Sequence, residues 1–256
     1  MVNKLRFFKY LFVTFFIIFV IRAFIIDSNY ISSGSMIPTL MSGDMVISSR
    51  FIYGFSLPFT NIKFLDFNKP ERGDIIIFEP PSKEFSKKQG FNSQLNTKDN
   101  FVKRMVAKSG DSIKMIDNIL YINDKEIKRV KENKVFSFKA LKSPYWLSYS
   151  SYLHKETIGE HNISSINIIP YPKMATNFGL NKFNKISYNK ESIKKPYIIP
   201  KNMVFVIGDN RGDSEDSRFF GPIPCNNIKG APVFIWYSSI DGKAQFDRIF
   251  TGLGGR

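Results

Sequence analysis

The strongest constraint on this chain is an apolar run near its N-terminus, FFKYLFVTFFIIFVIRAFII at residues 7–26. No charged residue interrupts residues 10–21. A helix needs about 20 mostly apolar residues to cross the hydrocarbon of a bilayer. Lys9 and Arg22 lie near the two ends of the run, where their long side chains can reach the headgroups. The pattern predicts one transmembrane helix.

The residues around the run indicate how the helix is oriented in the membrane and whether the segment is cleaved. Lys4, Arg6 and Lys9 have no acidic neighbour to balance them, and the basic flank of a membrane span stays cytoplasmic. A cleaved signal peptide is the alternative, but the run is long and no small-x-small cleavage site follows Ile26. We therefore expect an uncleaved anchor over residues 1–27, with a cytoplasmic N-terminus and the rest of the chain across the membrane.

Composition excludes several classes of site. The 256 residues carry a formal net charge of +15, which suits an anionic membrane surface or a nucleic acid. No basic run interleaved with aromatic residues marks a nucleic-acid motif, so we expect no nucleic-acid partner. The single cysteine, Cys225, allows neither an intrachain disulfide nor a Cys-rich metal site. His154 and His161 lie in a polar stretch without a nucleophile motif, so we expect a base other than histidine, and no metal or cofactor.

Beyond the apolar run the chain reads as short segments of strand length, rich in β-branched residues and bounded by Gly, Pro or Asp. The clearest segments are residues 45–48, 74–78, 203–207 and 233–237. Asp117-Asn118 predicts the turn of a hairpin. Residues 125–199, rich in Lys, Asn and Ser, indicate a β-rich insertion. We therefore expect a mainly β fold whose core is formed by residues 28–124 and 200–256.

The first motif that indicates chemistry is SSGSMIPTLMSGD, at residues 32–44. Gly34 permits unusual backbone angles just before Ser35, and Pro38 restricts the chain just after it. Such a turn can present a hydroxyl and a backbone N–H to the same space. A plain linker after an anchor is the alternative, but a linker does not need the proline and the interspersed apolar residues. Ser35 is therefore a candidate nucleophile.

The second motif is FVKRMVAKSGD, at residues 101–111, in which Lys103 lies among apolar residues. On a strand, Lys103 and Met105 would point to one face. A lysine in an apolar pocket loses hydration, so its pKa falls and its neutral amine can act as a base. The alternative is an edge-strand lysine that reaches water.

The third motif is GDNRGDSEDSRFFG, at residues 208–221, which brings acidic residues, arginines and Ser214 into one short loop. Paired Asp and Arg side chains can form bidentate bridges that hold the shape of a loop, and Ser214 could orient a lysine amine. A calcium loop or a solvated turn is the alternative. The spacing of an EF-hand is absent, and the arginines would repel a cation.

At these segments the sequence resembles the bacterial type I signal peptidases (leader peptidases), serine proteases with a Ser–Lys dyad. The family patterns are S-G-S-M-x-P-T-L, an R-G-D strand, a K-R strand followed by G-D, and G-D-N-R-x-x-S-x-D-S-R-x-x-G. They match in family order at residues 33–40, 72–78, 101–111 and 208–221. The joint match is far more specific than any single motif.

The resemblance implies a role for each matching residue. Ser35 would be the nucleophile, Lys103 the general base, and Ser33 Oγ with the Ser35 N–H the oxyanion hole. Ser214 would hydrogen-bond the Lys103 amine. The residues expected to brace the site are Asp216, Arg218, Asp209, Arg211 and Arg104. Those expected to line the pockets for small substrate residues are Ile31, Met36, Leu40 and Val102.

The resemblance also implies the fold and the setting. It implies a signal-peptidase-like and LexA-like β core, without cofactors, on the outer face of a bacterial inner (cytoplasmic) membrane. Its partners would be phospholipid and signal-peptide-bearing preproteins, cut after small-x-small sites. Ser32 replaces a proline common before S-G-S, and Gly212-Asp213 replaces the usual Asp-Asn pair. These departures bear on specificity and loop rigidity.

Three rival classes fit less well. A penicillin-binding or β-lactamase-type enzyme would use S-x-x-K and K-T-G motifs, which residues 192–195 and 108–110 resemble in reversed order. A LexA-like self-cleaving regulator would need a DNA-binding headpiece where this chain has its apolar run. A tethered binding module would not require Ser35, Lys103 and Ser214 together.

Overall fold

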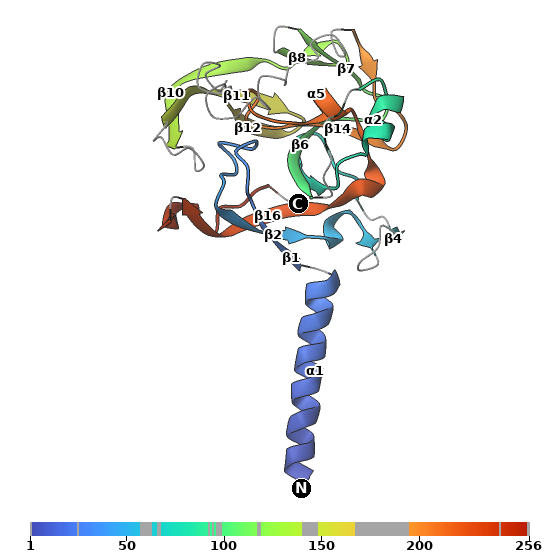
Figure 1. Cartoon of the computed structure of the whole chain (residues 1–256), viewed down its shortest axis with the longest axis vertical. Helices are drawn as coiled ribbons and strands as arrows, with labels where there is room; N and C mark the ends of the chain where they lie inside the picture. Colours follow the sequence, from blue (N-terminus) through green and yellow to red (C-terminus); the bar gives the residue numbers. More distant parts are fainter. Residues whose placement is uncertain are drawn as a thin grey trace.

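The computed structural model shows a β-rich body on a helical stem (Figure 1). It describes residues 2–24, 26–56, 63–65, 68–91, 93, 95, 99–116, 119–139, 148–166, 195–240 and 242–254. The predicted turn at Asp117-Asn118 lies outside these residues, as do residues 167–194 of the predicted insertion. The mainly β fold class is confirmed.

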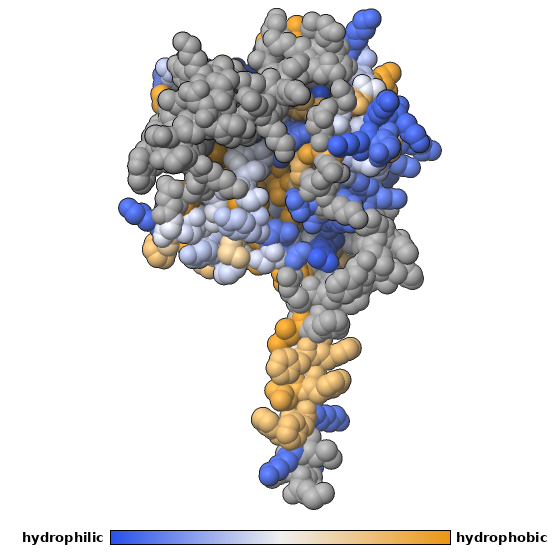
Figure 2. Space-filling view, in the orientation of Figure 1, coloured by the Kyte–Doolittle hydropathy of each residue, from blue (hydrophilic) through white to orange (hydrophobic). Residues whose placement is uncertain are grey.

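The stem is helix α1 (Val2–Phe24), which extends away from the body (Figure 1). At a rise of 1.5 Å per residue, its length is about 35 Å. Its described side chains are exposed, including Phe12 at 71% and Phe15 at 64%. They are mostly apolar, with hydrophilic residues toward the free end (Figure 2). Within the part of the chain that the structure describes, no helix combines the length and the apolarity that crossing a membrane requires.

The main sheet is antiparallel throughout, in the order β1-β2-β16-β5-β6-β14-β15, with β17 also paired to β16. Its strands are β1 (Ile26–Tyr30), β2 (Asp44–Ser49), β5 (Ile75–Phe78), β6 (Phe101–Lys108), β14 (Met203–Ile207), β15 (Ile223–Pro224), β16 (Ile228–Ile240) and β17 (Lys243–Ala244). All four of the clearest predicted strand segments fall in this sheet. Because β6 lies between β5 and β14, both of its edges are paired within the sheet.

Three smaller sheets complete the described fold. They comprise β10 (Arg129–Lys139), β11 (Ser148–Ile158) and β12 (His161–Ser165); β13 (Tyr197–Ile198), β7 (Ser112–Ile116), β8 (Ile119–Ile122) and β9 (Lys125–Glu126); and β3 (Phe55–Ser56) with β4 (Lys63–Leu65). The short helices are η1 (Phe51–Tyr53), α2 (Lys83–Lys88), α5 (Ser217–Phe220), η2 (Cys225–Asn227) and η3 (Phe246–Arg248). β7 and β8 pair as an antiparallel hairpin, as predicted.

The β11–β12 hairpin, which belongs to the predicted insertion, packs into the core. Ile158 and Ile163 are buried in one apolar cluster with Val106 of β6 and Phe205 of β14. Glycine permits the close approach, since a Cβ at Gly159 would lie 2.4 Å from the backbone oxygen of Arg72. The hairpin therefore lies against the strands that carry the candidate site.

Candidate functional site

The loop between β1 and β2, residues 31–43, carries Ser33 and Ser35 and is called the serine loop below. Its base is closed by hydrogen bonds from Ile31 N to Asp44 O (2.8 Å) and from Gly43 N to Ile31 O (2.9 Å). A turn within the loop, residues 34–37, is closed by the hydrogen bond from Ile37 N to Gly34 O at 3.2 Å and is called the serine turn. The loop therefore has a defined shape instead of that of a plain linker.

Asn210, from the third motif, grips this turn. Its backbone N–H donates to Ser35 O at 3.0 Å, and its side-chain Nδ2 donates to Gly34 O at 3.1 Å. Two successive carbonyls of the turn are thus directed at one residue. A Cβ on Gly208 would lie 2.5 Å from Ser35 O and 2.2 Å from Ser214 Oγ, so only glycine fits between them.

Ser35 and Lys103 meet at the centre of the site. Lys103 Nζ lies 2.6 Å from Ser35 Oγ, and Ser33 Oγ lies 3.2 Å from the same oxygen. Both members of the pair are buried, Lys103 at 4% exposure and Ser35 at 7%. The amine also donates to Val102 O at 3.1 Å. A hydroxyl held against an amine in this way can transfer its proton and attack an electrophile.

Burial lowers the pKa of Lys103 to about 8, because the charged ammonium is desolvated there. Nearby charges act on the pKa in both directions. Three carboxylates, those of Asp216, Glu215 and Asp213, raise it, whereas Arg218 lowers it. Desolvation is the largest of these effects. The structure therefore supplies the apolar setting that the sequence predicted for this lysine.

Asp216 holds the loop behind Lys103. It accepts hydrogen bonds from Gly208 N at 2.9 Å, Ser214 Oγ at 2.7 Å and Arg218 Nε at 2.7 Å. Burial alone would raise the pKa of Asp216, but Arg218 and these donors keep it below its usual value.

The hydrogen bond that the resemblance implies between Ser214 and Lys103 does not form in this structure. The Ser214 hydroxyl donates its hydrogen bond to Asp216, and the lysine amine donates to Ser35 Oγ and Val102 O. A buried carboxylate is the stronger acceptor for the hydroxyl. Ser214 therefore stands behind the dyad and braces the loop through Asp216.

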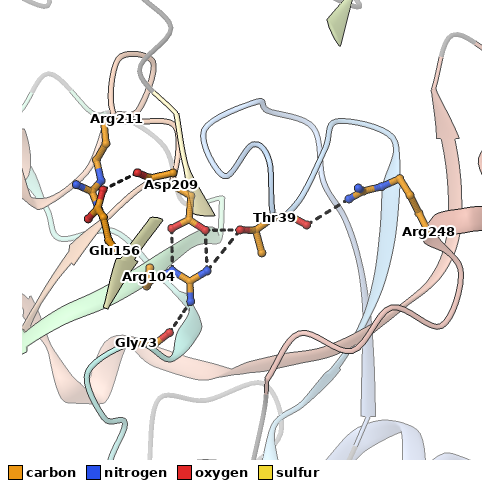
Figure 3. Close-up of polar contacts among 8 residues, drawn as sticks. Thr39, Gly73, Arg104, Glu156, Asp209, Arg211 and Arg248 are labelled. Carbon is orange, nitrogen blue, oxygen red and sulfur yellow. Dashed lines mark hydrogen bonds and ion pairs between the residues drawn. The ribbon is translucent and has the colours of Figure 1, made fainter. Parts of the chain in front are cut away.

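Arg104 and Asp209 form a bidentate pair (Figure 3). Arg104 Nε and Nη2 lie 2.8 and 2.7 Å from the two Asp209 carboxylate oxygens, and Nη1 donates to Gly73 O at 2.6 Å. Thr39 donates to the same carboxylate at 2.5 Å. Arg248 ties the loop from its other side, because its Nη2 donates to Thr39 O at 3.2 Å. The serine loop is thus clamped to β6, to the third motif and to the C-terminal segment.

Arg211 pairs with a residue that the sequence analysis missed. Its Nη2 lies 2.6 Å from Glu156 Oε2 of β11. Nothing in the local sequence marks Glu156, because it lies 55 residues from its partner within the predicted insertion. Thr39 and Asn210 were also not singled out, although both stand inside the recognised motifs and could have been found there.

The four predicted pocket residues come together in one apolar cluster. Ile31, Met36 and Leu40 are buried in it, and Val102 packs against it half-buried. Their partners are Val46, Ile75 and Ile235 from the sheet and Leu253 from the C-terminal segment. Ile31, Met36 and Leu40 therefore lie in the interior of the cluster, and Val102 is the predicted pocket residue that solvent reaches most easily.

Within the described part of the chain, no three His, Cys, Asp or Glu side chains are grouped as a metal site requires. In the acidic loop, Asp209 and Asp216 instead face arginines, at 2.7 Å in both cases. The loop is held by ion pairs.

Comparison with known proteins gives consistent matches. The family described as signal peptidase, peptidase S26, matches residues 4–237. Signal peptidase I of Buchnera aphidicola subsp. Schizaphis graminum (strain Sg) is 34% identical over 257 residues, covering 92% of this chain and 77% of that protein. Signal peptidase I of Rickettsia typhi (strain ATCC VR-144 / Wilmington) is 30% identical over 231 residues, covering 86% and 75%. A solved signal peptidase I from Enterococcus faecalis V583 is 20% identical, covers 65% of this chain and 98% of that chain, and has a TM-score of 0.31, too low to carry an argument.

The Arg104–Asp209 pair yields a stability prediction. Asp209→Asn should lower the free energy of unfolding by about 3–5 kcal/mol, because it leaves a buried guanidinium without its counter-ion. The matched control is Asp124→Asn, whose carboxylate is 73% exposed in its pair with Lys114 and should cost less than about 1 kcal/mol. Urea unfolding of the full chain measures both. Equal losses in the two variants would contradict a structural role for the buried pair.

Proposed function

The chain belongs to the signal peptidase family, peptidase S26, and from that premise we propose that it removes N-terminal signal peptides from exported preproteins through a Ser35–Lys103 dyad. The observation that carries the proposal is the buried contact of 2.6 Å between Lys103 Nζ and Ser35 Oγ. Family membership supports a serine endopeptidase, and this contact supports the assignment of its nucleophile and base.

The proposed reaction follows from the neutral amine. Lys103 accepts the Ser35 proton as Oγ attacks the scissile carbonyl. The oxyanion that forms is stabilised by the Ser35 N–H and by Ser33 Oγ, where a single donor contributes about 3–4 kcal/mol to lowering the barrier. The lysine ammonium then gives its proton to the leaving amine. In the second half, Lys103 takes a proton from water as the water oxygen attacks the acyl carbon. The ammonium then returns this proton to Ser35 Oγ as the acid product leaves, which restores the neutral amine.

The charged residues around the dyad support the reaction without touching the substrate. Asp216 and Arg218 hold the loop behind the amine, and Arg104 and Asp209 hold the serine loop against β6. Their paired charges keep the positions of Ser35 and Lys103 fixed, which matters because a misplacement of about 1 Å can cost about 100-fold in rate.

The apolar cluster under the serine loop fits a preference for small substrate residues. In an extended peptide, the first and third side chains before the cut point to the same face. That face would meet Val102, with Ile31, Met36 and Leu40 filling the space behind it. Shallow apolar depressions would accept small residues at both positions and reject large ones. This supports cleavage after small-x-small sites.

Helix α1 is the membrane anchor in this proposal, crossing a bacterial inner membrane once with its N-terminus in the cytoplasm. Its exposed phenylalanines and the basic residues before them support this topology. β1 begins at Ile26, two residues after the helix ends. Ser35 would therefore lie close to the membrane surface, where a spanning signal peptide presents its end. Tethering both partners to one membrane raises their effective concentration.

Replacing either member of the dyad should abolish cleavage. We expect Ser35→Ala and Lys103→Met, each in the full chain in detergent micelles, to cut a signal-bearing preprotein at least 1,000-fold more slowly than wild type, because the nucleophile or its base is lost. The control is Lys125→Met, an exposed lysine on β9, which should cut at the wild-type rate. If Lys103→Met is folded and cuts like Lys125→Met, Lys103 is not the base.

The pH dependence of cleavage should report the pKa of Lys103. The base must be neutral, so kcat/KM should rise about tenfold per pH unit below pH 8 and level off above it, with a midpoint near the pKa of about 8. Initial rates on a short peptide with a small-x-small site, from pH 6 to 10, measure the midpoint. A midpoint near that of an ordinary lysine, or a flat profile, would contradict an amine that is neutralised by burial.

The anchor can be tested by extraction of native membranes with alkaline carbonate. We expect the full chain to stay in the membrane pellet. The double variant Val13→Asp/Ile17→Asp should move to the supernatant, because each aspartate at a helix centre costs about 3 kcal/mol on insertion. Ile198→Asp, at a body position that is 67% exposed, is the control and should stay in the pellet. Release of the wild-type chain would exclude a spanning helix.

A further inference from the structure

We propose that Glu156, on strand β11, is a positioning residue that holds the serine turn in register with Lys103. The inference rests on the proposed dyad, and it extends the site to an insertion that none of the recognised motifs covers. It is built from three kinds of contact, namely buried ion pairs, backbone hydrogen bonds and apolar packing.

The Glu156 carboxylate is the centre of a buried charge cluster, with a side chain only 1% exposed. Oε2 accepts from Arg211 Nη2 at 2.6 Å. Oε1 accepts from Ser165 Oγ at 2.5 Å and lies 3.2 Å from Arg129 Nε. Because Arg129 and Arg211 both face this carboxylate, its negative charge is what allows two guanidinium groups to be buried side by side.

A short path of hydrogen bonds leads from this cluster to the nucleophile. The Arg211 N–H donates to Ile166 O at 2.8 Å, and the Ile166 N–H donates to Asp209 O at 3.0 Å, so this segment is bound to the end of the insertion hairpin. Asn210, between those two residues, donates to Ser35 O at 3.0 Å and to Gly34 O at 3.1 Å. A shift of Arg211 would therefore move the residue that grips the serine turn.

The same hairpin packs directly against the serine loop. Ile37, two residues after the nucleophile, is buried in a cluster with Leu153 of β11 and with Ile166. Phe136 of β10 and Met41 of the loop pack around this cluster. The insertion thus contacts the turn from one side with apolar side chains and holds it from the other through Asn210.

Removing the charge of Glu156 should disturb this arrangement in a predictable way. Burial lowers the pKa of Arg129, and the neighbouring Arg211 lowers it further, so these two cations already repel one another. Without the carboxylate they should separate, and Arg211 would carry Asn210 and the Ser35 turn away from β6. Water would then reach the Lys103 amine, which is now kept dry by that turn.

The experiment compares Glu156→Gln with Glu132→Gln in the full chain in detergent. Both substitutions remove one carboxylate from the β10–β11 pair, but Glu132 forms an ion pair with a lysine that is 67% exposed. We expect Glu156→Gln to lower kcat about 10- to 100-fold with KM changed less than twofold. We also expect the midpoint of its pH–rate profile to rise above that of wild type, because the amine regains hydration. Glu132→Gln should match wild type in all three.

Rates are expressed per folded molecule, from near-ultraviolet circular dichroism. A purely structural role would reduce the folded fraction but leave the rate per folded molecule and the pH midpoint unchanged, and that result would overturn the proposal. If Glu156→Gln does not fold, Glu156→Asp keeps the charge and withdraws the carboxylate by one methylene. Wild-type kcat and pH midpoint in a folded Glu156→Asp would overturn the proposal equally.

Failure of this inference is distinguishable from failure of the proposed function. If wild type cuts the preprotein, Ser35→Ala does not, and Glu156→Gln behaves like Glu132→Gln, the dyad stands and the positioning role falls. If wild type does not cut, or if Lys103→Met cuts normally, the dyad itself is wrong, and the positioning role falls with it.

Discussion

The site depends on the exclusion of water from one amine. Lys103 lies on β6, an interior strand of the main sheet, and its Nζ contacts Ser35 Oγ of the serine turn. Burial is the largest influence on its pKa. An exposed lysine remains protonated at neutral pH and cannot take a proton from a hydroxyl. The surrounding architecture therefore has two tasks, to keep the amine dry and to keep the turn that covers it in place.

Buried ion pairs perform the second task. Arg104–Asp209 joins β6 to the third motif, Arg211–Glu156 joins that motif to β11, and Arg218–Asp216 lies within the motif. The charged groups of all three pairs are almost wholly enclosed. Burying such pairs in place of apolar residues is rarely the best route to stability. They fix the relative orientation of the two partners, since a guanidinium donates to a carboxylate with good geometry in only a few orientations. Apolar side chains in the same places would hold the loops less strictly, because their packing does not fix one orientation and small shifts of the loops would be tolerated.

The local sequence indicated Ser35 and Lys103 as candidates, and the structure places their side chains in contact. Ser35 follows a glycine in a constrained turn, Lys103 lies in an apolar strand, and the motifs that contain them match a known family. The mainly β fold was predictable for the same reason, because strand-length apolar segments are bounded by turn residues. The choice of partners was not predictable. Glu156 meets Arg211 across 55 residues of chain, and that contact depends on how the hairpin packs in three dimensions. Ser214 donates to Asp216, two residues further along the same loop, and the local sequence does not decide between this acceptor and the Lys103 amine.

The two hydrogen bonds from Asn210 to the serine turn join parts of the chain that are synthesised at different times. The gripping amide is 176 residues further along the chain than Gly34, whose carbonyl it binds. At a synthesis rate of about 5–20 residues per second, Ser35 is made about 10 seconds or more before Asn210. A nascent chain thus carries Ser35 and Lys103 while the loop that holds them does not yet exist. The order of the segments along the polypeptide therefore delays the assembly of the Ser35–Lys103 contact until the third motif has been synthesised.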